Sequence, residues 1–172
     1  MTRSTRPAIP PPVLLLLLAL AAACGLPRDP EGTLERVRGG TIRVGYVVDT
    51  PWVAAAGQGA AGIEGTIVAE LARGLGARVA WIHGAETELL TALHEGDLDL
   101  VVAGLTKESP WKGKVSLTRP YYVDTVVVHG KHREIPHVIA VRSGENGWQV
   151  HVERVLESRK RELAVLRHAS VQ

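Results

Sequence analysis

The stretch Leu-His-Glu-Gly-Asp-Leu-Asp-Leu-Val-Val-Ala-Gly-Leu-Thr, residues 93–106, decides the fold of this chain. Gly96 ends a segment with helical spacing, and the run 98–102 that follows is apolar enough to be covered on both faces of a sheet. A strand of this kind, reached from a helix through a short connection, is typical of parallel sheets. The stretch therefore predicts a layered α/β domain.

The segments before this stretch repeat the same alternation. The β-branched run 41–48 predicts a first strand, and Asp49-Thr50-Pro51 ends it with turn residues. The small, glycine-rich segment 54–61 predicts a mobile loop. Periodicity then predicts helices over 66–75 and 87–94, a second strand over 77–82 and a third over 98–102. Strands and helices in this order predict a mainly parallel sheet with flanking helices.

The N-terminus predicts export and attachment to a membrane. Arg3 and Arg6 precede the apolar run 13–23, which is too short to span a bilayer, and Cys24 follows three alanines. This pattern resembles a bacterial lipobox, except that Ala21 stands where that motif usually has leucine. We expect a signal peptide at 1–23, lipid attachment at Cys24, a tether over 24–33 and one domain over 34–172. Ordinary cleavage at the same site, leaving a free thiol, is the alternative.

The composition of the processed chain excludes some classes of function. Removing residues 1–23 takes away two arginines, which leaves 18 basic residues (20 minus 2) against 18 acidic residues. This balance does not indicate a nucleic-acid surface, so we expect no nucleic acid as a partner. Since Cys24 is the single cysteine of the chain, no internal disulfide can form.

Several segments together resemble the first lobe of the family 3 extracellular solute-binding proteins, the receptor components of ABC importers for polar amino acids and similar solutes. These segments are, in order, 42–46 (IRVGY), 62–65 (GIEG), 75–77 (LGA), 93–106, 118–122 (TRPYY) and 138–146 (VIAVRSGEN). The resemblance implies the type 2 periplasmic binding protein fold. It also implies that the second lobe is missing, because only residues 130–136 lie where that family inserts it.

The two strands that link the lobes in this family are expected here over 125–129 and 137–141. Joined by a short turn, they would form an antiparallel hairpin over 125–141 beside the parallel sheet, in place of the second lobe. A final amphipathic helix is expected over about 147–167. Its apolar residues Val150, Val155, Leu156 and Leu163 would then pack on the remaining lobe.

The ligand-binding candidates lie after the predicted strands, at the edge where open α/β sheets bind ligands. They are Asp49, Trp52, Gly104, Leu105, Thr106 and Trp111. Trp52 matches an aromatic residue of the family cleft, with core packing as the alternative, and Asp49 is a ligand group or only a turn residue. The amides near Gly104 and the Thr106 hydroxyl are expected to hold a polar or anionic group. Glu64, at the start of a helix, is expected to be structural.

One departure from the family concerns amino-acid recognition. Relatives that bind amino acids carry an arginine a few residues after the third strand, which pairs with the ligand carboxylate in two parallel hydrogen bonds. Here Trp111 stands at that position, and neither Lys112 nor Arg119 aligns with it. The sequence therefore disfavours an α-amino acid as ligand.

The sequence gives little indication of metal binding or catalysis. His129, His132 and His137 lie close together and are candidate ligands for zinc or nickel, but their spacing matches no known zinc pattern, and unliganded surface histidines are the default. There is no Gly-x-Ser-x-Gly motif and no evident pair of catalytic carboxylates, so we expect no enzyme and no cofactor. Dehydratase chemistry, known in relatives of this fold, ranks last.

The sequence thus predicts an exported, lipid-anchored protein of the periplasm or outer face of the cell membrane. Its expected function is that of a receptor for a small polar solute, working with an ABC permease. The alternative is a scaffold or interaction protein at the membrane that has lost solute binding, with exposed tryptophans in the old cleft as its contact surface. A metal-binding lipoprotein is a third and weaker interpretation.

Overall fold

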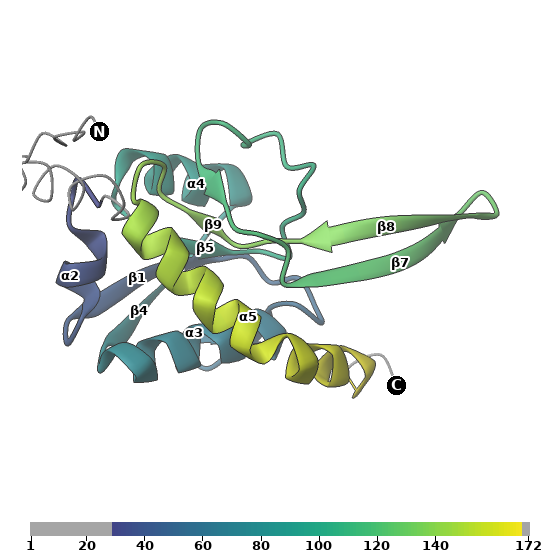
Figure 1. Ribbon diagram of the computed structural model, residues 1–172, viewed down its shortest axis with the longest axis horizontal. Coiled ribbons are helices and arrows are strands. Elements are labelled where there is room, and N and C mark those ends of the chain that lie inside the picture. The colour runs from purple at the N-terminus through teal and green to yellow at the C-terminus, as the bar shows by residue number, and fades with distance from the viewer. Residues whose placement is uncertain (1–28, 170–172) are drawn as a thin grey trace, which may run out of the picture.

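The computed structural model describes residues 29–169, with side chains to residue 160 (Figure 1). The expected signal peptide, Cys24 and the first part of the tether lie outside these residues. Within the described part of the chain, no helix combines the length and apolar character needed to cross a membrane.

The core is a five-stranded sheet in the order β4-β1-β5-β9-β6. Strand β1 (Thr41–Tyr46) pairs in parallel with β4 (Arg78–His83) on one side and with β5 (Leu100–Val102) on the other. Strand β9 (Ala140–Val141) then runs antiparallel between β5 and β6 (Ser116–Leu117). The predicted α/β fold, a single lobe with a mainly parallel sheet, is confirmed.

Helices cover both faces of this sheet, as Figure 1 shows. On one face, α3 (Gly62–Leu75) and α5 (Asn146–Ala169) pack together over a core that includes Leu100 and Val102. On the other face, α4 (Glu86–Glu95) covers a core that includes Val101. Neighbouring residues of β5 thus point to opposite cores, which explains why this strand is apolar at every position.

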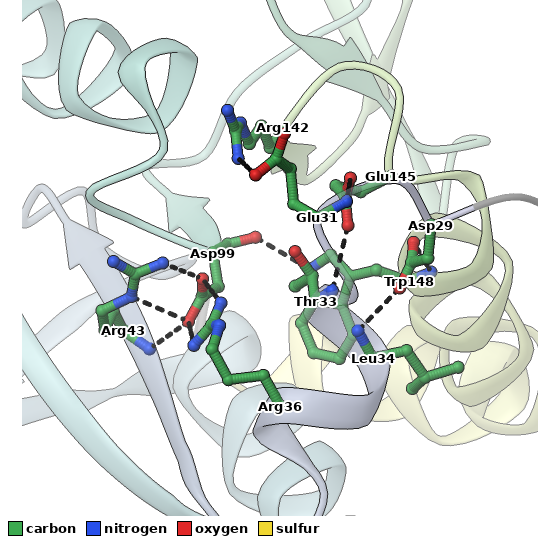
Figure 2. Close-up of polar contacts among 10 residues, drawn as sticks. All are labelled: Asp29, Glu31, Thr33, Leu34, Arg36, Arg43, Asp99, Arg142, Glu145 and Trp148. Carbon is green, nitrogen blue, oxygen red and sulfur yellow. Dashed lines mark hydrogen bonds and ion pairs between the residues drawn. The ribbon is translucent and has the colours of Figure 1, made fainter.

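The segment before the first strand is fixed to the domain by side-chain caps (Figure 2). Glu145, just before α5, accepts hydrogen bonds from the amides of Glu31 and Thr33, both at 3.0 Å. Asp29 accepts hydrogen bonds from the amides of Leu34 at 2.7 Å and Trp148 at 3.0 Å, so it caps both α2 (Thr33–Val37) and α5. Residues 29–33 were expected in the tether, and that expectation is wrong.

Two local elements differ from their prediction. The segment 54–61 is a small antiparallel hairpin, β2 (Ala54–Ala56) and β3 (Gly59–Ala61), and not a loop. Gly59 lies so close to Trp81 of β4 that a Cβ there would be 2.5 Å from the indole ring, so the hairpin is packed onto the sheet. Helix α3 also begins at Gly62, four residues before its predicted start.

The long hairpin after the sheet has other bounds than expected. Strands β7 (Tyr122–Val128) and β8 (Lys131–His137) pair antiparallel over seven residues, with the turn at His129 and Gly130. The return strand was expected over 137–141, but residues 140–141 form β9 in the main sheet. Figure 1 shows β7 and β8 extending beyond the body of the domain.

Helix α5 begins at Asn146, one residue before its predicted start. It buries Trp148, Val152 and Leu156 against the sheet. The indole Nε1 of Trp148 donates a hydrogen bond to the Asp99 carbonyl at 2.8 Å, which satisfies the polar edge of this fully buried ring. Val155, also expected in this core, is half-buried and packs against it, whereas Val150 is only half-buried. The side chain of Leu163 lies outside the described part of the chain.

Candidate functional site

A pocket of about 340 Å³ lies at the carboxyl ends of the parallel strands. Its walls come from the loop after β1, the start of α4 and the loop that follows β5. The lining residues are Asp49, Glu86, Ala103, Gly104, Leu105, Thr106, Glu108, Ser109 and Pro110. Four of the six predicted ligand candidates, Asp49, Gly104, Leu105 and Thr106, therefore lie together here.

The side chains of this pocket carry one sign of charge. Asp49, Glu86 and Glu108 bring three carboxylates, while Thr106 and Ser109 bring hydroxyls, and no basic residue is among the lining residues. Carboxylates and hydroxyl oxygens accept hydrogen bonds from cations. The polar lining therefore favours a positively charged solute over an anion.

The backbone at Gly104 is held in place from beneath the pocket. Gly104 has a φ of +60°, and a Cβ at this position would lie 2.2 Å from Oδ2 of Asp49. Its amide donates a hydrogen bond to Oε2 of Glu64 at 3.1 Å. This amide was expected to be open to an anionic ligand, but Glu64 already occupies it.

Glu64 itself is fully buried at the first turn of α3. Its Oε1 accepts a hydrogen bond from the hydroxyl of Tyr121 at 2.6 Å. Burial raises the pKa of Glu64 to about 7, although the hydrogen bonds from Tyr121 and Gly104 oppose the rise, and the nearby charge of Asp49 adds to it. Burial also raises the pKa of Tyr121 well above its ordinary value.

Trp52 lies in an aromatic cluster and not on the pocket wall. Its side chain is 6% exposed and stacks on His137 with ring centroids 3.7 Å apart. Tyr121 and Tyr122 complete the cluster, with centroids at 6.2 and 5.5 Å from Trp52. The core-packing alternative thus describes the position of Trp52, because the ring lacks the open face that a cleft residue needs.

Trp111 is half-buried and packs beside the α4 core, outside the pocket lining. Lys114 lies over its ring, with Nζ 5.0 Å from the centroid, which is within the range of a cation–π contact. Two of the six candidates, Trp52 and Trp111, are therefore not part of the pocket. Of the other two tryptophans, Trp148 is buried and Trp81 is half-buried.

The loop that forms the pocket wall is bonded to the root of the long hairpin. The Leu105 carbonyl accepts a hydrogen bond from the Val138 amide at 2.9 Å, and the Lys107 amide donates one to the Pro136 carbonyl at 3.1 Å. Thr106, between them, bridges to His137. The position of the wall therefore depends on how β8 leaves the domain.

The three histidines that were candidate metal ligands do not converge. His129 is in the turn at the tip of the hairpin, and His132 is exposed near it. His137 lies at the far end of β8, five residues from His132, which is about 17 Å along a strand. Among the described residues, no group of three or more histidine, cysteine or acidic residues is placed to hold a metal ion.

The sequence profile of the bacterial extracellular solute-binding proteins, family 3, matches residues 42–166. The chain belongs to this family. Membership implies an exported protein that binds a solute outside the cytoplasm. None of the curated proteins matches the chain.

Solved structures with the same fold include domain 1 of TmArgBP in its arginine-bound form. It is 22% identical with a TM-score of 0.60, and the match covers 72% of this chain and 97% of that one. An ancestral cationic amino acid solute-binding protein is 18% identical, with a TM-score of 0.68 over 81% of this chain and 100% of that one. A Salmonella typhimurium periplasmic binding protein with high arginine specificity is 11% identical, with a TM-score of 0.64 and coverage of 77% and 99%.

Sequence reasoning missed five residues of the pocket lining: Glu86, Ala103, Glu108, Ser109 and Pro110. The rule that identified Asp49 also applies to Glu86, because Glu86 follows β4 at the same edge of the sheet. Glu108 and its neighbours are in the loop between β5 and β6, whose path no periodicity reveals.

Proposed function

We propose that this protein is the membrane-anchored receptor component of an ABC-type importer and that its solute is small, polar and positively charged. The observation that carries the proposal is the acidic pocket at the carboxyl edge of the sheet, in a lobe of the solute-binding family. The proposed receptor binds the solute and delivers it to the permease without changing it chemically. The lipid anchor at Cys24 is a further part.

Two features support a cation that lacks an α-carboxylate. The three carboxylates of Asp49, Glu86 and Glu108 attract a positive charge, and the occupied amide of Gly104 removes a donor for an anion. In addition, Trp111 stands where relatives that bind amino acids carry the arginine for the ligand carboxylate. A diamine or a guanidinium amine fits this combination better than a zwitterionic amino acid.

A single lobe leaves one side of the solute open, and pockets usually cover most of a small ligand. Domain 1 of TmArgBP, which also corresponds to one lobe, has an arginine-bound form. That precedent supports solute binding by a lobe of this fold without its partner lobe. We expect modest affinity here, with the permease supplying the opposite wall at the membrane.

The test is calorimetry of the purified protein with putrescine, agmatine, L-arginine, L-glutamine and L-glutamate. The proposal expects saturable binding of putrescine or agmatine, weaker binding of the amino acids and none of glutamate. If none of the five compounds binds, or if glutamate binds most tightly, the proposal is contradicted. Recovery of lipid-modified protein from membranes, lost in Cys24→Ser, tests the anchor.

The second candidate function, an interaction protein that binds no solute, is favoured by the hairpin. Val123, Val127 and Val128 of β7 are exposed by 46%, 63% and 43%, and Val123 and Val127 point to the same face. A two-stranded hairpin alone in water is marginally stable, so a partner would stabilise it. If the protein is an interaction protein, Val127→Lys should weaken its co-purification with a membrane protein. If it is a solute receptor, the same change should leave solute binding unchanged.

A further inference from the structure

Glu64 is a buried carboxylate directly beneath the proposed solute pocket, and solute binding as described above gives it no role. It is 0% exposed, and both its oxygens accept hydrogen bonds from other elements. Oε2 accepts from the amide of Gly104, which lines the pocket, and Oε1 accepts from the hydroxyl of Tyr121 just before β7. One side chain thus joins α3, the pocket wall and the start of the long hairpin.

A second carboxylate reaches the same glycine. Oδ2 of Asp49, which lines the pocket, lies where it would be 2.2 Å from a Cβ at Gly104, so no residue with a side chain fits between them. The charges of Glu64 and Asp49 are close enough to interact. Two carboxylates that share a small volume resist being ionised together.

The geometry points to Glu64 as a positioning residue that couples the binding of a cation in the pocket to the release of its own proton. This inference rests on the proposed function. Burial and, to a smaller extent, the charge of Asp49 favour the protonated form of Glu64. A cation beside Asp49 cancels the second effect, so the carboxyl O–H bond of Glu64 gives its proton to the buffer. The ionised carboxylate then accepts the hydrogen bonds from Gly104 and Tyr121 at full strength, which fixes the wall against the solute.

The surroundings of Glu64 place this exchange near neutral pH. Burial raises the pKa of its carboxyl to about 7, and the titratable groups that act on it are Tyr121 and Asp49. The N-terminus of α3, where Glu64 lies, favours the ionised form and so opposes the effect of burial. Affinity for a cation is therefore expected to rise as the pH rises through 7.

The test uses agmatine, whose guanidinium and amine both stay charged between pH 6 and 8. The purified protein is titrated calorimetrically at both pH values, each in two buffers with different enthalpies of ionisation. If binding lowers the pKa of Glu64 by about one unit, affinity rises about fivefold from pH 6 to pH 8 and protons are released. In Glu64→Gln both effects vanish. Glu70→Gln, on the same helix and outside the pocket, keeps both.

A second measurement follows the Gly104 amide by NMR without any solute. Its shift should move with pH, with a midpoint near 7, in the wild type and in Glu70→Gln but not in Glu64→Gln. Agmatine binding that is equally tight at both pH values, or a Gly104 shift that titrates unchanged in Glu64→Gln, would overturn the inference. A Gly104 amide that titrates as expected while agmatine does not bind would overturn the proposed solute and leave Glu64 as the residue that positions the wall.

Discussion

Trp52 and His137 stack with ring centroids 3.7 Å apart, and this contact joins the loop after β1 to the root of the long hairpin. Both residues are buried, and Tyr121 packs against the same indole. Because Tyr121 also holds Glu64, the aromatic cluster and the floor of the pocket form one connected unit. A change in the cluster is therefore expected to reach the pocket through packing and not through contact with solute.

Trp52→Ala is expected to lower the free energy of unfolding by about 3–5 kcal/mol, because it removes a large buried ring and leaves a cavity. Trp52→Phe should cost clearly less, since it keeps aromatic packing against His137. Urea denaturation followed by circular dichroism measures both. A Trp52→Ala protein of unchanged stability with lost solute binding would instead identify Trp52 as a ligand residue.

Glu64→Gln is expected to change how stability depends on pH. The pKa of Glu64 is raised to about 7 in the folded protein from about 4.5 in the unfolded chain, so its stabilising contribution is complete below about 4.5 and is lost as pH rises through 7. The wild type should therefore lose roughly 3 kcal/mol of unfolding free energy relative to Glu64→Gln between pH 4.5 and 8. Parallel stability curves for the two proteins would contradict this.

Asp99 should have the opposite dependence on pH. Its side chain is 1% exposed, and hydrogen bonds from Arg43 and Arg36 outweigh the effect of burial and lower the pKa of its carboxyl (Figure 2). The stability that Asp99 contributes is present above its unfolded pKa of about 4 and is lost as pH falls through the lowered folded value. Denaturation between pH 2 and 6 measures this loss.

The matched variant for that measurement is Asp99→Asn. At pH 7 it should cost about 1–3 kcal/mol, because the amide of Arg43 and two guanidinium groups lose a charged acceptor. Its stability should also change less in acid than that of the wild type. Equal acid sensitivity of both proteins would show that another carboxyl is responsible.

The layered α/β architecture and the mainly parallel sheet could be predicted from sequence, because they follow from apolar runs such as the one in β5. The capping residues Asp29 and Glu145 could not, since each bonds to amides more than a hundred positions away in the chain. The hairpin was predicted to exist, but its return strand ends at His137, where the chain pairs with Thr106 in a tertiary contact. At the pocket, strand ends identified Asp49 and Gly104.

Trp52 was harder to place for a different reason. An aromatic residue after a strand suits both a pocket and a core, and only the position of His137 decides between them. Glu86 follows the second strand at the same edge as Asp49, so the rule that found one carboxylate extends to the other. The loop around Glu108 has no such marker, because neither helical nor strand periodicity continues through it.

The last prediction concerns the negative charge of the pocket lining. Glu86→Gln and Glu108→Gln keep size and hydrogen bonding but remove one charge each, and both side chains are exposed to solvent. Exposed charges contribute modestly, so each change should weaken agmatine binding by roughly two- to fivefold.

Salt screens exposed charges, so the wild type should lose affinity with added salt more steeply than the double variant. Glu134→Gln, an exposed carboxylate on β8 outside the pocket lining, serves as the control and should change neither affinity nor salt dependence. If the double variant binds agmatine as the wild type does, the solute does not lie between these carboxylates.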